Sequence, residues 1–297
     1  MRALPDDWPL RAHSRTVDAG GVHWHVQDLG HGPVVLLVHG TGASTHTWRG
    51  LAPLLARHGR VIAPDLPAHG GTPRPRDAAR LGLPGMADAL GDLLHAMDVK
   101  PSLVVGHSAG AAVLARLCLD GRIAPAGLVS INGALLEVPG LPRSVFSPLA
   151  RVLASSSLFP QLFAWRARDP AAVRRLVAST GSRIDEAGMR QYARLVSDPD
   201  HVAGVLAMLG QWDLGPLQRE IGRLTTPLLL VAASGDRTVP PSESERVQRR
   251  VPGSELVALP GLGHLAHEED PQGVARLLRK FADRVSARGP RVSPSRQ

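Results

Sequence analysis

The sequence predicts an α/β fold in which a mainly parallel sheet is flanked by helices and interrupted by a helical insertion. Three observations predict this fold. Short apolar runs alternate with segments of helical spacing at about the interval of βαβ units. The apolar run 103–105 leads through a Gly-x-Ser-x-Gly turn directly into a segment of small residues with helical character. Strand patterns disappear between 134 and 216 and then resume.

In the first half of the chain the expected strands are short and apolar, and helices connect them. Residues 1–14 form an irregular lead-in, and the alternation in 23–28 indicates an antiparallel strand. His23 and His25 share one face of that strand, where paired surface histidines are favoured over a metal site because no third ligand is near. Strands are expected at 33–38, 60–66, 103–105 and 126–131, and helices at 47–57, 86–97 and 111–119.

The second half of the chain contains the insertion and the rest of the sheet. Between 134 and 216, segments rich in leucine, alanine and arginine are separated by prolines, which predicts several short helices. Strands are expected at 227–233 and 255–259, and Pro271 opens a terminal helix. The chain is therefore divided into a first core part (1–133), an insertion (134–216), a second core part (217–286) and a disordered tail (287–297).

Composition narrows the classes of function. The 297 residues are 43% hydrophobic, which suffices for a large core, and the formal charge is +8. Arginines are spread along the whole chain with no basic run interleaved with aromatic residues, so a nucleic-acid partner is not expected. A single cysteine, Cys118, excludes an internal disulfide and fits a reducing compartment. No apolar run reaches the roughly 18 residues of a membrane span, so a cytoplasmic protein is expected.

The turn Gly106-His107-Ser108-Ala109-Gly110 is typical of a nucleophile elbow. It lies between an apolar strand and a helix, which is the context that lifts a serine hydroxyl over the end of a sheet. Glycines are needed on both sides because the strand and the helix approach too closely for a Cβ. The helix that begins behind Ser108 also directs free N–H groups toward the site. Ser108 is therefore the candidate nucleophile.

A nucleophilic serine needs a histidine base, and the base needs a carboxylate. Asp236 directly follows the strand 227–233, and His264 follows the next strand. The carboxyl ends of parallel strands meet at one edge of a sheet, so these residues are expected to lie beside Ser108. The order Ser, Asp, His is that of α/β-hydrolases. His267 could support His264 but is expected at the surface.

An acyl-transfer site also needs two N–H groups for the oxyanion. The first candidate is the backbone of Ala109, immediately after the nucleophile. The second is Thr41, in the loop after the strand 33–38, where Gly40 and Gly42 give the backbone freedom to direct its N–H group. His39 is expected to brace this loop. No motif for a nucleotide, a metal ion or another cofactor is present in the sequence.

With these residues in place, about 13–285 resembles the α/β-hydrolase superfamily with an inserted helical lid. The resemblance implies an eight-stranded, mostly parallel sheet. One branch is matched more narrowly, that of the magnesium-chelatase accessory proteins of bacteriochlorophyll biosynthesis. Ala68 departs from the superfamily, which usually has glycine at that place. The phrases that carry the resemblance are Trp24–Gln27, His39–Arg49, Asp65–Gly70, the Ser108 elbow and Gly261–Glu269.

Two functions are consistent with these features. The complete Ser-Asp-His set favours a serine hydrolase acting on an ester or related acyl bond of a small molecule, for which the resemblance suggests a tetrapyrrole. The alternative is a non-catalytic accessory protein that binds porphyrin or magnesium chelatase subunits, because a fold does not fix a function. Arg143, Arg151 and Arg166 of the insertion could face substrate carboxylates, although solvated helix faces are the favoured interpretation.

Overall fold

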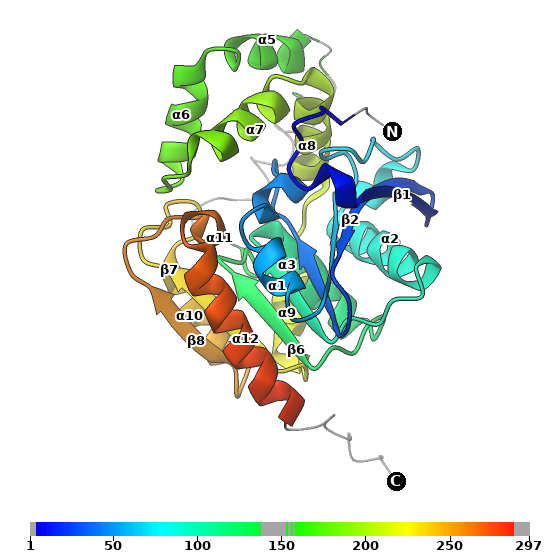
Figure 1. Ribbon diagram of the computed structural model, residues 1–297, viewed down its shortest axis with the longest axis vertical. Coiled ribbons are helices and arrows are strands. Elements are labelled where there is room, and N and C mark those ends of the chain that lie inside the picture. The colour runs from blue at the N-terminus through cyan, green and yellow to red at the C-terminus, as the bar shows by residue number, and fades with distance from the viewer. Residues whose placement is uncertain (1–3, 138–152, 154–155, 157, 288–297) are drawn as a thin grey trace.

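The computed structural model describes residues 4–137, 153, 156 and 158–287. Its strands form one eight-stranded sheet of order β1-β2-β4-β3-β5-β6-β7-β8 (Figure 1). β1 is antiparallel to β2, and β2 is antiparallel to β4, whereas every other neighbouring pair is parallel. The mostly parallel sheet predicted from the sequence is thus confirmed. The strands are β1 (Ser14–Ala19), β2 (Val22–Leu29), β3 (Val34–Val38), β4 (Arg60–Pro64), β5 (Leu103–His107), β6 (Gly127–Ile131), β7 (Leu228–Ala233) and β8 (Glu255–Leu259).

Helices cover both faces of the sheet because its central strands are apolar on both sides. In β3, Leu36 belongs to the core cluster on one face and Leu37 to the cluster on the other. The first cluster is closed by α2, α3, α9 and α10, and the second by α1 and α12. These helices are α1 (Ala52–Ala56), α2 (Leu83–Ala96), α3 (Ala109–Leu119), α9 (Gly215–Glu220), α10 (Pro241–Arg250) and α12 (Pro271–Ala287), and a short α11 (Ala266–Glu269) precedes α12.

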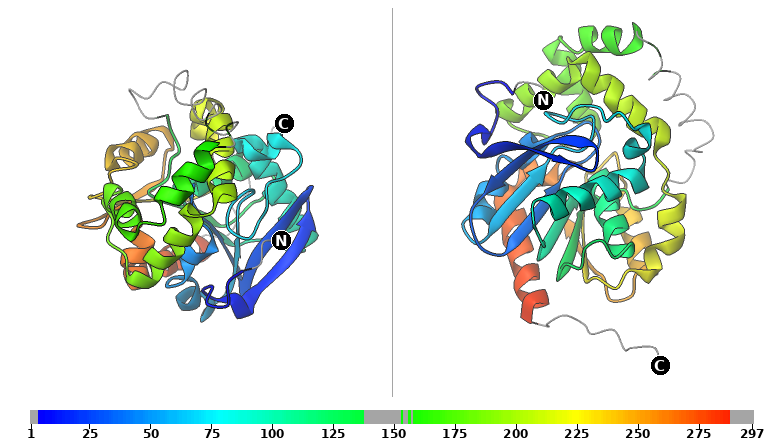
Figure 2. Two further views of the ribbon diagram at one scale, coloured as in Figure 1. Left: turned by 90° about the horizontal axis from the view of Figure 1, so that it is seen from above. Right: turned by 90° about the vertical axis from the view of Figure 1, so that its right-hand side faces the viewer.

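Within the described residues, four helices between β6 and α9 lie beyond the carboxyl ends of the parallel strands (Figures 1 and 2). Three of them begin at an aspartate whose side chain accepts backbone N–H groups of the first turn, namely Asp169, Asp185 and Asp198. Proline at the first helical position further favours two of these starts. The helices are α5 (Leu158–Arg166), α6 (Pro170–Ser179), α7 (Glu186–Val196) and α8 (Pro199–Gln211).

Several local expectations were wrong or fall outside the described residues. The edge strand β1 was not predicted, because its exposed and polar residues give little apolar signal. The single helix expected at 47–57 is a 3₁₀ turn, Thr45–Trp48, followed by α1, since proline at the start of α1 cannot continue a preceding helix. α10 was not predicted because its sequence is almost entirely polar and its buried Val247 gives no apolar periodicity. The expected tail lies outside the described residues from 288 onward.

Candidate active site

Ser108 occupies the corner between β5 and α3 in a backbone conformation that few residues adopt. Its φ is 50° and its ψ is −119°, outside the regions that L-residues favour. A Cβ at Gly106 would overlap the backbone of Ala111, and one at Gly110 would overlap the carbonyl group of Val38. The two glycines therefore allow the strand and the helix to pack closely enough to hold Ser108 in this conformation.

Asp236 and His264 form a buried hydrogen-bonded pair. His264 Nδ1 lies 2.7 Å from Asp236 Oδ2, and the two residues are 8% and 0% exposed in their side chains. The other carboxylate oxygen, Oδ1, accepts the backbone N–H groups of Thr238 at 2.7 Å and Val239 at 2.9 Å. An ionised carboxylate only accepts hydrogen bonds, so Nδ1 of the neutral ring carries the proton. His264 Nε2 is then left as an acceptor.

The carbonyl group of His264 is held by two side chains. His107 Nε2 donates to it at 2.9 Å, and burial lowers the pKa of His107 well below the usual value, so its ring stays neutral. Asn132 Nδ2 donates to the same oxygen at 2.9 Å and to Gly263 O at 3.1 Å. Asn132 Oδ1 accepts the N–H group of Ala233 at 2.8 Å. Asn132 was missed in the sequence, although asparagine directly after a strand is a recognisable signal for its positive φ of 46°.

The connection between α6 and α7 joins the loops that carry Asp236 and His264. The Thr180 carbonyl oxygen accepts the N–H groups of Arg237 at 3.1 Å and His264 at 3.3 Å. Ser182 Oγ accepts the N–H group of Leu265 at 2.8 Å. The sequence analysis missed Thr180 and Ser182, because hydrogen bonds between segments that are far apart in the chain leave no local sequence pattern.

The expected oxyanion residues lie beside the serine. Thr41, Ser108, Ala109 and His264 all line one pocket. Ala109 is the first residue of α3, so its N–H group has no partner within the helix. A Cβ at Gly40 would lie 2.9 Å from Ser108 Cβ, which shows how closely this loop approaches Ser108. No hydrogen bond joins the Ser108 hydroxyl group to the His264 ring within the described part of the chain.

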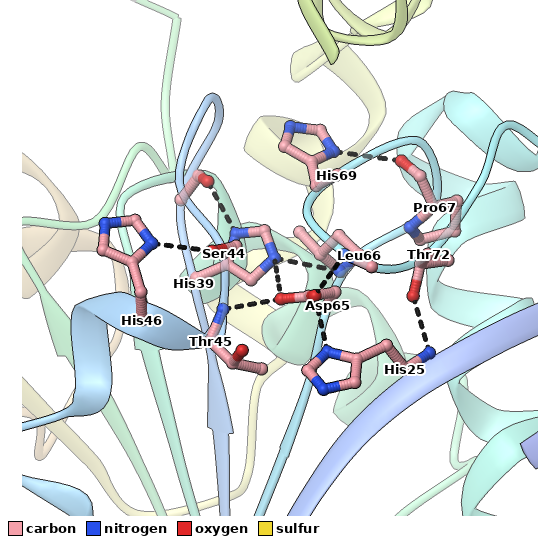
Figure 3. Close-up of polar contacts among 12 residues, drawn as sticks. His25, His39, Ser44, Thr45, His46, Asp65, Leu66, Pro67, His69 and Thr72 are labelled. Atoms are coloured by element: carbon pink, nitrogen blue, oxygen red, sulfur yellow. Dashed lines mark hydrogen bonds and ion pairs between the residues drawn. The ribbon is translucent and has the colours of Figure 1, made fainter. Parts of the chain in front are cut away.

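His39 connects the loop after β3 to the loop after β4 (Figure 3). Its Nε2 accepts the N–H group of Leu66 at 2.9 Å, and its Nδ1 lies 2.8 Å from the carbonyl oxygen of Gly40, to which it donates. Gly42, one residue beyond Thr41, has a φ of +75°. The loop is thus anchored at its base, and Gly42 lets the chain turn above Thr41.

Asp65 lies beneath this loop as a fully buried carboxylate (Figure 3). It accepts hydrogen bonds from the N–H groups of Thr45 at 2.6 Å and Gly71 at 2.7 Å and from His25 Nδ1 at 2.7 Å. Burial alone would raise the pKa of Asp65, but the imidazole of His25 and these hydrogen bonds lower it far below its usual value. His25 is therefore buried, and the expectation of paired surface histidines was wrong for it. His25 lies on β2 beside β4, and its carbonyl oxygen accepts the N–H group of Asp65 at 2.9 Å, which fixes its strand against the loop after β4.

His267 is also buried, which corrects the expectation that it lies at the surface. Its Nε2 is 2.7 Å from Thr47 Oγ1, and its ring centroid is 4.5 Å from that of His107. Burial lowers the pKa of His267 to about 3. It contacts the ring that holds the His264 carbonyl group, so it supports that loop from behind.

Ala68 has a φ of 66°, a conformation that favours glycine. This explains why the superfamily usually has glycine there. In this chain the Cβ of Ala68 faces α8, where a Cβ added at Gly204 would lie 2.7 Å from it. The methyl group of Ala68 is therefore accommodated by the missing side chain of Gly204.

The pocket above Ser108 has a volume of about 1060 Å³ and a mostly apolar lining. The insertion contributes Phe163, Leu176 and Tyr192, among others, to this lining. Arg166 is exposed and does not line the pocket, which agrees with a solvated helix face. Arg143 and Arg151 lie outside the described residues.

Within 4–137, 153, 156 and 158–287, no group of three or more His, Cys, Asp or Glu side chains is placed to hold a metal ion. No helix in the same ranges combines the length and the apolar character needed to cross a bilayer.

Comparison with known proteins shows the class to which this fold and site belong. The model of the alpha/beta hydrolase family matches residues 35–277, and the chain belongs to that family. An α/β-hydrolase fold protein from Burkholderia ambifaria superposes with a TM-score of 0.75 over 90% of this chain and 100% of that one, at 24% identity. This structural likeness shows the fold alone.

The curated relatives place the chain more narrowly. It is 39% identical to the magnesium-chelatase 30 kDa subunit of Rhodobacter capsulatus over 279 residues, 93% of this chain and 97% of that protein. It is 28% identical to the 2-hydroxy-6-oxo-2,4-heptadienoate hydrolase of Pseudomonas putida over 90% of this chain and 95% of that enzyme. The resemblance drawn from the sequence is confirmed, and relatives with hydrolase activity and a chelatase-associated relative both lie within it.

Proposed function

We propose that the chain is a serine hydrolase that cleaves an ester or related acyl bond with Ser108, His264 and Asp236. The observation that carries the proposal is the buried Asp236–His264 pair, which leaves His264 Nε2 as an acceptor in the pocket that Ser108 lines. A protein without a catalytic task has no need for these three residues at the ends of three strands. In this proposal the insertion 134–216, which contains helices α5–α8, acts as a lid over the pocket.

The geometry supports a two-step acyl transfer. His264 Nε2 removes the proton of Ser108 as Oγ attacks the carbonyl carbon, and Asp236 stabilises the imidazolium that forms. The N–H groups of Ala109 and Thr41 stabilise the oxyanion of the tetrahedral intermediate. His264 then gives its proton to the leaving group, and water repeats the sequence on the acyl-enzyme to release the acid and restore Ser108.

The setting we propose is bacteriochlorophyll biosynthesis near magnesium insertion, in the cytoplasm. Its support is the 39% identity to a relative named as a magnesium-chelatase subunit. A mostly apolar pocket of about 1060 Å³ suits a large apolar acyl compound such as a tetrapyrrole ester.

The same relative favours a second candidate, an accessory protein that binds porphyrin or chelatase subunits without catalysis. A triad has no evident part in metal chelation, and the sequence has no Gly-x-x-x-x-Gly-Lys-Ser/Thr loop for ATP. Binding of chelatase subunits that persists in a Ser108→Ala variant, together with no reaction at Ser108, would favour this candidate.

Intact-mass analysis after treatment with a fluorophosphonate probe tests the first proposal. A single adduct on the wild type and none on Ser108→Ala is the expected result, and porphyrin esters are then screened as substrates. Absence of an adduct on a folded wild-type protein would contradict the proposal. A Ser130→Ala variant is the matched control, because Ser130 is a buried serine in the neighbouring strand β6 and should leave labelling unchanged.

A further inference from the structure

The outer face of α5 carries large apolar side chains in water. Leu158, Leu162 and Trp165 follow one another at intervals of four and three residues, so they share one face of the helix. Their exposed fractions are 74%, 57% and 61%. The opposite face buries only the small residues Pro160 and Ala164. A helix that is apolar on both faces is normally covered on both, and α5 exposes its larger side chains.

Arginines follow this apolar stripe along the chain. Arg166 and Arg168 come directly after Trp165, and Arg174 and Arg175 lie on α6, all four being exposed. Arg174 and Arg175 form exposed ion pairs with Glu186 at 3.5 Å and Asp169 at 3.6 Å, and such pairs are weak enough for an anionic headgroup to compete with them. Asp169 is the single acidic residue between 158 and 176, so this segment carries a net charge of +3. Exposed tryptophan and leucine side chains enter the interface of a bilayer, and neighbouring arginines attract its anionic headgroups.

The position of α5 suits a broad, flat partner. α5 lies at the end of the molecule farthest from the C-terminal end of α12, above α7 and α8 (Figures 1 and 2). A helix at a projecting end can contact a lipid surface without any shape complementarity. We name the apolar stripe and its four arginines the α5 patch.

The α5 patch borders the pocket above Ser108. Phe159 of α5 lines that pocket and also a second hollow together with Leu158 and Leu162. Phe163 of α5 and Leu176 of α6 line the pocket and are 39% and 44% exposed, so these apolar side chains lie between the outer surface and the pocket. A molecule dissolved in a bilayer could enter the pocket from this side without crossing water.

We propose that the α5 patch docks the protein on a bilayer that contains anionic lipids. The apolar stripe of α5 enters the headgroup region, and the four arginines bind the anionic headgroups. This docking stands independently of the reaction proposed for Ser108, because its test measures lipid binding in the absence of turnover.

Co-sedimentation with vesicles tests the docking. The probe is phosphatidylcholine with about 30% phosphatidylglycerol, compared with phosphatidylcholine alone, at low and at about 0.5 M salt. The full chain should bind the anionic vesicles at low salt and bind far less at high salt. A Leu158→Gln, Leu162→Gln, Trp165→Gln variant should bind at least about a hundredfold more weakly.

Two further variants distinguish the effect of positive charge at the α5 patch from the effect of the protein's total positive charge. Arg166→Gln with Arg168→Gln should weaken binding by about fivefold for each arginine. Arg276→Gln with Lys280→Gln removes the same charge from exposed positions on α12, on another side of the molecule, and should change binding little. An equal effect of the two charge variants would overturn the assignment to this patch.

Tryptophan fluorescence gives a second measurement. Of the five tryptophans, Trp24 and Trp48 are 0% exposed and Trp8 is 5% exposed, Trp212 is half-buried in the pocket lining, and Trp165 is 61% exposed. Vesicles should therefore shift the emission to shorter wavelength in the wild type, and Trp165→Phe should remove the shift while keeping most of the binding. No binding to anionic vesicles by the folded protein would overturn the proposal. Self-association that is lost in the triple variant, without vesicle binding, would assign the patch to a protein partner instead.

Discussion

The contact of Gly181 with the loops that carry Asp236 and His264 can be tested by the addition of a single methyl group. Gly181 lies between α6 and α7 with a φ of +84°, and a Cβ added there would be 1.9 Å from the carbonyl oxygen of Gly235. That oxygen belongs to the residue before Asp236. Gly253 is a matched control, because its φ is +79° and nothing lies within 4 Å of an added Cβ.

The expected magnitudes follow from these two environments. A left-handed conformation costs an alanine about 1–2 kcal/mol, and this cost is common to both sites. Overlap with a backbone oxygen adds about 1–3 kcal/mol, because the two loops must move apart. Gly181→Ala should therefore lower the free energy of unfolding by about 2–5 kcal/mol, and Gly253→Ala by about 1–2 kcal/mol. Loss of flexibility in the unfolded chain affects both variants alike and cancels in the comparison.

The clash should also reduce reactivity at Ser108. Displacement of the Gly235 loop by about 1 Å moves Asp236 relative to His264, which should slow fluorophosphonate labelling by about a hundredfold. Urea unfolding and the labelling rate constant are measured for the wild type and both variants. Equal stability and equal labelling of the two glycine variants would refute the inference that the α6–α7 connection positions the loops of Asp236 and His264.

Three further predictions concern the triad, the buried histidines and α8. Asp236→Asn should slow fluorophosphonate labelling of Ser108 by about 10⁴-fold. The N–H groups of Thr238 and Val239 hold the amide oxygen, so the amide N–H group faces His264 Nδ1. The proton of the His264 ring then moves to Nε2, which can no longer accept the proton of Ser108. Unchanged labelling would contradict the assigned acid. Burial lowers the pKa of several histidines, which stay neutral in the fold but gain protons when unfolded below about pH 6.5. The free energy of unfolding should be at its maximum above that pH and should fall by up to about 7 kcal/mol for each unit by which the pH is lowered below it. Urea unfolding would refute this if the free energy changed by less than about 1.4 kcal/mol per pH unit. Gly204→Ala should destabilise despite a gain in helix propensity, because its Cβ would lie 2.6 Å from Ala68 O; thermal unfolding at or above the wild-type midpoint would contradict the contact. The histidines whose pKa is lowered by burial, and on which the pH prediction depends, are His39, His46, His69, His107 and His267.

The sequence by itself determined the fold class and the order of the candidate triad. Apolar runs that are buried on both faces specify a parallel sheet, and β3, β5, β6, β7 and β8 were all expected from them. The elbow was readable because its glycines, its serine and the flanking strand and helix are contiguous in the chain. Asp236 and His264 were readable because each follows a strand end, and parallel strands end at one edge.

Only the tertiary structure decided how these residues are held. Asn132 and Thr180 each connect the His264 loop to a distant segment through hydrogen bonds, and neither contact has a periodicity or a local motif. His25 and His267 are buried because neighbouring segments cover them, so their surroundings depend on packing rather than on adjacent residues. The exposed side chains of α5 are likewise a result of packing, since α5 packs against α8 and buries only Pro160 and Ala164. Local patterns specify elements, whereas contacts between distant segments specify the positions of side chains.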